Sequence, residues 1–355
     1  MGPLALFRDA LKSLAQNHGD RFEIIALVHR RDLFDVDGVT FVEFPRISSS
    51  WLGRLRFEYW SSKEISRRLK PSLWLAMHDI TPNVTADVRA VYCHNGAPFY
   101  RPRWFELRDD PKFVAFCLFY GFLYRINIHA NDYVIVQQSW IREEFRRRYG
   151  VRNVVVAHPS VDVPKTASAS ARSRLPRPYR FFYPAAPRTF KNPEVCLQAS
   201  RLLEARNITN FELWFTFDAS TNRYASRLAK QFSDVKSVRW LGSLARERVF
   251  DLYGEADCLL FPSRLETWGM PITEFRSLGK PMLVADLPYA HETAAGYDFA
   301  KLFDPDDAGH LANLMAQAAN GEPIFRKLPE AAIESPYAGN WAELWELLLD
   351  QHRRA

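Results

Sequence analysis

The chain has 355 residues, of which 47% are hydrophobic and 25% are charged, and these are the proportions of a globular protein rather than a disordered one. Because a single hydrophobic core rarely serves more than roughly 250–300 residues, two domains are expected. The net charge of +6 favours an anionic partner, and nucleic acid, lipid headgroups and nucleotide phosphates all meet that condition.

Cysteine usage and apolar runs indicate the compartment. Met1 leads into a charged amphipathic segment rather than into a signal peptide. The most apolar stretch, residues 113–124, is short of the roughly 20 residues that span a bilayer. A cytoplasmic, reducing location is therefore predicted, without a zinc site or disulfides, because four cysteines lie in separate apolar runs without paired spacing: Cys93, Cys117, Cys196 and Cys258.

The first half of the chain alternates between helical and strand-like patterns. Apolar residues recur at helical spacing in residues 3–16, and residues 139–149 are also predicted to be helical. This alternation predicts a doubly wound parallel sheet, with strands at residues 22–28, 39–44, 73–77, 88–93, 133–137 and 154–157.

A basic helix is predicted at residues 52–69. Residues 51–70 contain six Lys or Arg against two Glu, and they include Trp51 and Trp60. Such a helix can rest on an anionic membrane surface. A core helix with a solvated basic face explains the same pattern, and the sequence leaves both interpretations open.

His94 stands at the end of a predicted strand. It follows residues 88–93 and precedes Asn95 and Gly96, a turn with no packing demand for an imidazole. A ligand contact is therefore favoured over a purely structural role for His94, and Asn95 is a weaker candidate on the acceptor or sugar side.

A small, polar, proline-bounded stretch divides the chain. We predict an N-terminal domain at residues 1–163, a linker at 164–178, a C-terminal domain at 179–335 and a C-terminal helical segment at 336–355. A second doubly wound sheet follows from strands predicted at residues 181–184, 211–217, 258–261 and 282–285, with helices at 193–206, 221–232 and 245–256. Residues 237–242 end in a Leu-Gly turn.

Two glutamates lie close together in the second domain. Glu266 is in the loop that follows strand 258–261, at the edge where parallel sheets bind ligands. Glu274 is expected in the first turn of a helix that begins near Pro271 and stops before Gly279. Free backbone N–H groups at that helix start favour an anion. The segment therefore suits a sugar nucleotide, although Glu274 as a mere helix-end acid remains an equal alternative.

The run PSRLETWGMPITEFRSLGKPMLVAD, which holds both glutamates, resembles the nucleotide-sugar motif of the retaining family 4 glycosyltransferases. The resemblance implies the GT-B fold: two Rossmann-like domains that face a cleft, and a C-terminal helix that crosses back to the first domain. Trp341, Leu344, Trp345 and Leu348 would supply the apolar stripe of that helix. Family members have a strand and a Gly-rich loop before the helix that here begins at Pro3, so the first strand is expected to be missing and the native start to lie upstream.

The resemblance also implies roles for residues. Glu266, His94 and Lys191 would be catalytic, and Arg188 with Lys191 would clamp the donor diphosphate, although Arg188 lies nearer to the lysine than in the commoner pattern. The remaining residues of the predicted donor site are Leu241, Gly242, Thr267, Gly269, Met270, Pro271 and Glu274.

The predicted activity is a retaining hexosyl transfer from a nucleoside-diphosphate sugar to a lipid-linked glycan acceptor in bacterial surface polysaccharide assembly. No metal or other cofactor is expected, because the acidic run at residues 304–307 is typical of a helix cap. The enzyme is expected on the cytoplasmic face of the inner membrane, with peripheral membrane contact and no nucleic-acid partner. Two alternatives stay open. One is a GT-B sugar-nucleotide epimerase, which would need further acidic residues and a histidine for proton abstraction in the first domain, where the sequence offers only His94. The other is a non-catalytic nucleotide- or lipid-binding member of the fold.

Overall fold

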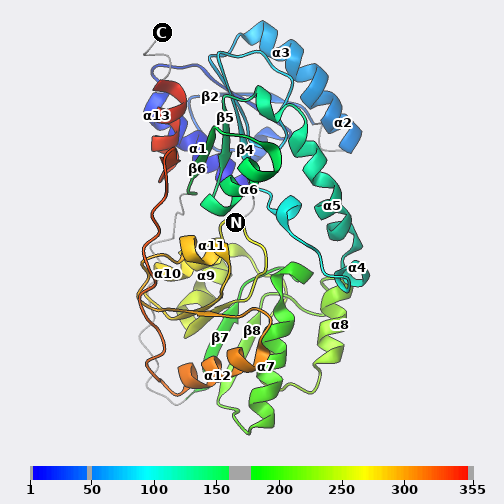
Figure 1. The fold of residues 1–355 in the computed structure, drawn as a ribbon, viewed down its shortest axis with the longest axis vertical. Coiled ribbons are helices and arrows are strands. Elements are labelled where there is room, and N and C mark those ends of the chain that lie inside the picture. The colour runs from blue at the N-terminus through cyan, green and yellow to red at the C-terminus, as the bar shows by residue number, and fades with distance from the viewer. Residues whose placement is uncertain (1–2, 46–49, 160–176, 351–355) are drawn as a thin grey trace. The chain divides into compact units, whose positions relative to one another are not determined.

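The computed structural model describes residues 3–45, 50–159 and 177–350, which form two compact units (Figure 1). Unit 1 comprises residues 1–99, 118–160 and 333–355, and unit 2 comprises residues 100–117 and 161–332. Most of the predicted linker, 164–178, lies outside the described residues. Residues 100–117 belong to unit 2, whereas the sequence had been divided only at the linker, so unit 2 contains a segment from the first half of the chain.

Unit 1 contains two parallel sheets. Strands β1 (Ile24–Val28) and β2 (Val39–Glu43) form one. The other has the order β13-β6-β5-β4-β3, from β3 (Leu73–Ala76), β4 (Val88–Cys93), β5 (Tyr133–Val136), β6 (Val154–Ala157) and β13 (Tyr337–Ala338). In the described part of the chain, β1 and β3 thus each have an edge that pairs with no strand, as expected for a sheet without its first central strand.

The C-terminal helix belongs to unit 1, as predicted. Helix α13 (Trp341–Leu349) packs beside α1 (Pro3–His18) (Figure 1), and the indole N–H of Trp345 donates to the Ala10 carbonyl at 3.2 Å. The predicted apolar stripe is buried: Trp341, Leu344, Trp345 and Leu348. These side chains join Tyr92, Ile135 and Val155 of the sheet in one hydrophobic cluster.

The other helices of unit 1 agree with the predicted positions. Helix α6 (Ser139–Tyr149) ends at Gly150, which takes a left-handed conformation (φ 68°). The predicted helix at 52–69 consists of α2 (Trp51–Arg56), a π-helical turn η3 (Phe57–Ser61) and α3 (Ser62–Leu69). Short 3₁₀ turns complete the unit: η1 (Arg31–Leu33), η4 (Ala97–Phe99) and η5 (Ile128–Ala130).

Helix α5 (Pro111–Arg125) carries the chain from unit 2 back into unit 1. The segment Pro111–Ala130 is long and apolar enough to cross a membrane by length and composition, with 33% of that window buried in the protein. Core helices of proteins that never enter a membrane have the same composition. Tyr120 and Tyr124 of α5 are buried inside unit 1, so this part of the helix belongs to a protein core.

Unit 2 is built on one six-stranded parallel sheet in the order β12-β11-β10-β7-β8-β9. The strands are β7 (Tyr179–Tyr183), β8 (Phe211–Phe215), β9 (Val238–Trp240), β10 (Cys258–Phe261), β11 (Met282–Ala285) and β12 (Ala300–Phe303). Strands β10 and β11 are buried along their whole length, which explains their uninterrupted apolar sequences.

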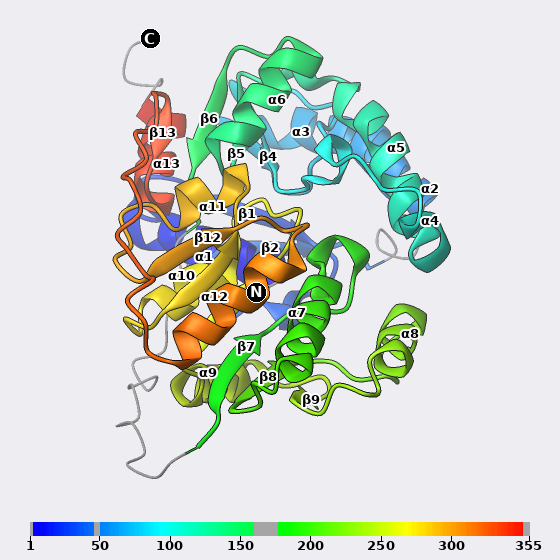
Figure 2. The ribbon, with the colours of Figure 1, turned by 60° about the horizontal axis from the view of Figure 1, so that its bottom comes forward.

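Helices cover the sheet of unit 2. Helix α7 (Pro193–Ala205) packs beside α12 (Ala308–Ala319), as both views show (Figure 1, Figure 2). The remaining helices are α4 (Glu106–Asp109), α8 (Arg223–Gln231), α9 (Arg246–Glu255), α10 (Met270–Arg276), α11 (Pro288–Thr293) and the 3₁₀ turn η6 (Thr189–Lys191). The predicted helix cap holds, since the Asp307 carboxylate accepts from the His310 N–H at 2.8 Å at the start of α12.

Candidate functional site

The predicted donor residues gather where the strand order of unit 2 reverses. Strand β7 lies between β8, the next strand in the chain, and β10, and such switch points are where open parallel sheets bind ligands. Lys191 follows β7 and Glu266 follows β10. The Lys191 ammonium donates to Glu266 Oε1, and both side chains are largely buried. The structure therefore brings together two of the three residues predicted to be catalytic.

The backbone around Lys191 is fixed by hydrogen bonds. The Tyr183 hydroxyl donates to the Lys191 carbonyl at 2.6 Å. The buried Asn192 adopts a left-handed conformation (φ 55°), and its amide donates to the Pro305 carbonyl at 2.8 Å. Burial, followed by the nearby charge of Glu266, raises the pKa of Tyr183, so this tyrosine stays neutral beside the ion pair.

Arg188 has a different partner. Its Nε lies 2.7 Å from Asp110 Oδ2, and its guanidinium stacks over the Phe113 ring at 5.7 Å from the centroid. Phe113 packs on Phe190 with their centroids 4.6 Å apart. The sequence did not reveal Asp110, because it comes from the segment 100–117 that folds onto unit 2.

The loop after β10 contains a left-handed glycine. Gly269 has a φ of 89°, and a Cβ there would lie 3.1 Å from Ile272, so glycine is required. Pro271 stands in the first turn of α10, as predicted. Thr267, Met270 and Pro271 are partly exposed, and the loop can therefore contact a ligand.

The position predicted for Glu274 was wrong. Helix α10 begins at Met270, so its first turn contains no acid and Glu274 lies one turn further along. Its carboxylate is buried, accepts from the Tyr253 hydroxyl at 2.9 Å and lies 3.6 Å from the Arg246 guanidinium. Glu274 is therefore held inside the unit by α9, and a contact with a ribose remains a prediction.

Leu241 and Gly242 follow β9, as predicted. The Leu241 N–H already donates to the Phe215 carbonyl at 2.9 Å. Gly242 has a φ of 73°, and a Cβ there would lie 3.1 Å from Asp218 Oδ2. This turn belongs to the same edge of the sheet as Lys191 and Glu266, because every strand pair in the sheet is parallel.

His94 and Asn95, the candidates from the first half of the chain, are held by one buried carboxylate in unit 1. Asp79 Oδ1 accepts from the N–H groups of His94 (2.7 Å) and Asn95 (3.1 Å), and it lies 3.6 Å from His94 Nδ1. The hydroxyls of Tyr124 (3.1 Å) and Tyr120 (3.4 Å) also donate to Asp79. Asp79 was not among the residues predicted from the sequence, although an aspartate three residues beyond strand β3 is a recognisable signal.

The described part of the chain contains no cluster of metal ligands. Within residues 3–45, 50–159 and 177–350, no group of three or more His, Cys, Asp or Glu side chains is placed to hold a metal ion. All four cysteines are buried and free, and burial raises the pKa of each thiol. The site therefore offers two cations, two carboxylates and backbone groups for polar contacts.

Comparison with known proteins shows a match to one family model and establishes the fold. Residues 167–335 match the family model described as glycosyl transferases group 1. The chain is 24% identical over 253 residues to a D-inositol 3-phosphate glycosyltransferase of Streptomyces avermitilis, which is 64% of this chain and 54% of the relative. It is 23% identical over 167 residues to the serotype-specific mannosyltransferase WbdA of Escherichia coli, which is 46% of this chain and 20% of that protein. The chain thus spans about half or less of these relatives.

Among solved structures, WaaG, a glycosyltransferase involved in lipopolysaccharide biosynthesis, superimposes with a TM-score of 0.61. The match has 13% sequence identity and covers 99% of this chain and 92% of WaaG. At this identity the match establishes the fold alone. The predicted α/β class and GT-B architecture, with two Rossmann-like units, are confirmed.

Proposed function

We propose, because residues 167–335 match the family model described as glycosyl transferases group 1, that the protein transfers a hexose from a nucleoside-diphosphate sugar to a glycan acceptor with retention at the anomeric carbon. The observation that carries the proposal is the Lys191–Glu266 pair at the switch point of the sheet within the matched segment. A glycan substrate in bacterial surface polysaccharide assembly is the proposed setting, since WaaG is described as a glycosyltransferase involved in lipopolysaccharide biosynthesis.

The leaving group of such a reaction is a nucleoside diphosphate, and the chief catalytic demand is to stabilise its negative charge as it departs. Lys191 and Arg188 would bind the diphosphate oxygens, with the backbone N–H groups of Gly269 and Met270 nearby. Positive side chains can supply this stabilisation without a metal ion, so we propose a metal-independent reaction. Activity should then survive excess EDTA, and its loss on chelation, with recovery on adding Mg²⁺ or Mn²⁺, would contradict this assignment.

Both cations are paired with acids in the structure, Lys191 with Glu266 and Arg188 with Asp110. These ion pairs keep each cation in position and compensate its charge before the donor binds. A diphosphate carries more charge than either carboxylate and can replace it. Glu266 would then be released toward the transferred hexose, where its oxygens can accept from sugar hydroxyls, while Glu274 would accept from the ribose.

A lipid-linked acceptor would bring the protein to the membrane. Trp51 (51% exposed), Leu52 (80%) and Trp60 (69%) project from the basic segment 51–70. The Trp51 ring packs on Tyr120 of α5 with centroids 6.3 Å apart, and α5 itself exposes Leu118, Phe119 and Phe122. Exposed aromatic and aliphatic side chains among arginines suit an anionic lipid surface, and peripheral contact there is part of the proposal.

The transferase assignment is tested by incubating the protein with UDP-, GDP- and dTDP-sugars, with and without glycan acceptors, and by following product configuration by NMR. We expect glycosylated product with retained configuration, and a roughly 100-fold lower rate for Glu266→Ala. Interconversion of sugar nucleotides without acceptor would indicate an epimerase instead. Nucleotide binding without any turnover would indicate a non-catalytic protein. Sedimentation with vesicles containing phosphatidylglycerol, using Trp51→Ala and Leu52→Ala as variants, tests the membrane contact separately.

A further inference from the structure

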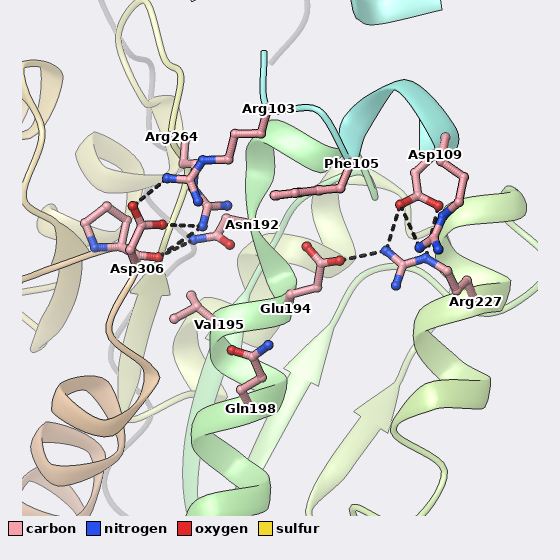
Figure 3. A pocket seen from close by; sticks show the side chains of 12 residues that line it. Arg103, Phe105, Asp109, Asn192, Glu194, Val195, Gln198, Arg227, Arg264 and Asp306 are labelled. Atoms are coloured by element: carbon pink, nitrogen blue, oxygen red, sulfur yellow. Dashed lines mark hydrogen bonds and ion pairs between the residues drawn. The ribbon is translucent and has the colours of Figure 1, made fainter. Parts of the chain in front are cut away.

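A polar pocket of about 360 Å³ lies within unit 2, and none of the predicted donor-site residues lines it. It is enclosed by residues 103–109, by the start of α7, and by the loops that follow β10 and β12 (Figure 3). Its volume falls in the range of small-molecule sites, ~300–1,000 Å³.

One wall of the pocket is built around Asp306. This carboxylate accepts from the guanidinium groups of Arg103 and Arg264, the latter at 2.7 Å. Hydrogen bonding from Arg103, together with Arg264, lowers the pKa of Asp306 to about 2. The Nε of Arg264 is buried and has no hydrogen-bond partner among the described residues. This wall therefore holds a fixed ion-pair cluster with at least one unused donor.

The opposite wall is built around Arg227. Its guanidinium makes a two-point contact with Asp109, with both N–O distances 3.0 Å, and it donates to Glu194 at 2.7 Å. The other oxygen of Glu194 accepts from the Tyr224 hydroxyl at 2.8 Å. Two-point arginine–carboxylate contacts fix the orientation of both groups. Figure 3 shows this cluster facing the Asp306 cluster across the pocket.

The segment that closes the pocket is anchored at both ends. Arg103 binds Asp306 at one end, and Asp110 binds Arg188 at the other. Figure 3 shows the Phe105 ring between the two walls, with Gln198 on the side of α7 below. Gln198 is exposed, and its side-chain amide makes no hydrogen bond to another group in the described part of the chain. The pocket is thus a preformed cavity lined by the aromatic ring of Phe105 and the side-chain amide of Gln198.

The lining selects the class of ligand. Four arginines and three carboxylates line the pocket, so its charge is nearly balanced. An anion would have to displace carboxylates that are already paired, at a desolvation cost. A hydroxyl instead donates to a carboxylate and accepts from a guanidinium at once, and a ring of C–H groups can stack on an aromatic face.

We propose that this pocket binds a neutral saccharide residue, with its hydroxyls on the Arg264–Asp306 and Glu194–Arg227 groups and one ring face on Phe105. Binding of the saccharide does not depend on the proposed transfer reaction. If that reaction holds, a glycan acceptor long enough to reach the pocket gains a second point of attachment.

The test uses the full chain and three probes: methyl α-glucopyranoside, methyl α-mannopyranoside and methyl β-galactopyranoside. They are titrated into the millimolar range, where a single ring with few contacts binds. Saturation-transfer NMR should detect at least one of them. Phe105→Ala should weaken its binding by roughly threefold to tenfold, and Gln198→Ala by roughly threefold. Leu107→Ala, an exposed residue of α4 outside the pocket, is the matched control and should bind normally.

Several outcomes would overturn the proposal. The first such outcome is that none of the three pyranosides binds. Binding that is unchanged by Phe105→Ala and Gln198→Ala but lost in Glu266→Gln would place the sugar at the predicted donor site. Binding of inorganic phosphate, followed by phosphorus NMR and lost in Phe105→Ala, without pyranoside binding, would make the pocket an anion site. Thermal melting of each variant confirms that it is folded.

Discussion

Each unit of this protein has a carboxylate just beyond a parallel strand, and the two carboxylates make different kinds of contact. Asp79, after β3, is buried and accepts from two backbone N–H groups and two tyrosine hydroxyls. Glu266, after β10, meets the flexible ammonium of Lys191. A carboxylate held by several donors stabilises a turn, whereas one paired with a single side-chain ammonium can exchange that partner for a ligand. The first therefore positions His94, and the second is suited to binding.

The largest effect on stability is expected from Asp79→Ala. The substitution removes the acceptor that the N–H groups of His94 and Asn95 share, and each unsatisfied buried group costs about 1–3 kcal/mol. The free energy of unfolding should fall by about 3 kcal/mol or more in urea titrations. Asp37→Ala, at an exposed position of unit 1, is the control. A loss no greater than that of the control would show that Asp79 does not hold the turn.

A second effect concerns pH and again contrasts the units. Burial raises the pKa of Glu58 in unit 1 to about 7 from 4.5. Folded Glu58 keeps its proton up to that pH while the unfolded chain loses it near 4.5, so the free energy of unfolding should fall as the pH rises between these values, by about 3 kcal/mol in all.

Glu58→Gln removes this dependence and should make the protein more stable at pH 7.5 than the parent, as measured by urea denaturation across the pH range. Glu64→Gln, on the exposed face of α3, should keep the parent profile. In unit 2, Asp306 gives a pH dependence of the opposite sign. Its pKa is lowered to about 2, so its contribution to the free energy of unfolding is lost as the pH falls below about 4. An unchanged slope in Glu58→Gln would contradict the burial argument.

Glu266→Ala should affect catalysis rather than folding. The expected result is a roughly 100-fold lower kcat, with the affinity for bare UDP or GDP almost unchanged, because the partner of Glu266 in the reaction is the transferred sugar. Steady-state kinetics and calorimetry with the nucleoside diphosphate measure the two quantities. A loss of nucleotide affinity with a normal kcat would reverse the assigned role.

Glu274→Ala should weaken binding of bare UDP or GDP by roughly tenfold to 100-fold, since a lost charge-assisted pair of hydrogen bonds costs about 1.5–3 kcal/mol. Because Glu274 also accepts from Tyr253, Tyr253→Phe is the matched variant. It should lower the melting temperature but leave nucleotide affinity in place. Equal loss of affinity in both variants would show that Glu274 acts only through packing.

The smallest effect is expected from Asp110→Asn, which releases Arg188. A partly exposed ion pair contributes about 0.2–1 kcal/mol, so affinity for UDP or GDP should rise by up to roughly fivefold at low salt. Asp251→Asn, at an exposed position of α9, should change nothing. Lower nucleotide affinity in Asp110→Asn would indicate that Asp110 orients Arg188 for the diphosphate rather than competing with it.

Local signals in the sequence were enough to predict most strands and helices, the left-handed Gly279 after α10 and the placement of Glu266 after β10. Alternating apolar runs, Pro and Gly each act within a few residues, and parallel strands put their carboxyl ends on one edge whatever the details of packing. The same reasoning predicted Glu274 in the first turn of α10. The helix begins one residue earlier than predicted, and the Glu274 carboxylate is buried, where it accepts a hydrogen bond from Tyr253.

Only the tertiary structure decided which carboxylate each polar group meets. Asp79 reaches His94 across 15 residues, and Asp110 reaches Arg188 because residues 100–117 fold onto unit 2. The pocket beside Phe105 depends on ion pairs of residues 103–109 with α8 and with the loop after β12. These contacts have no period and no fixed spacing in the sequence, because they follow from how separate elements pack. The sequence alone therefore identifies the residues of the site, and the packing determines which residues pair with them.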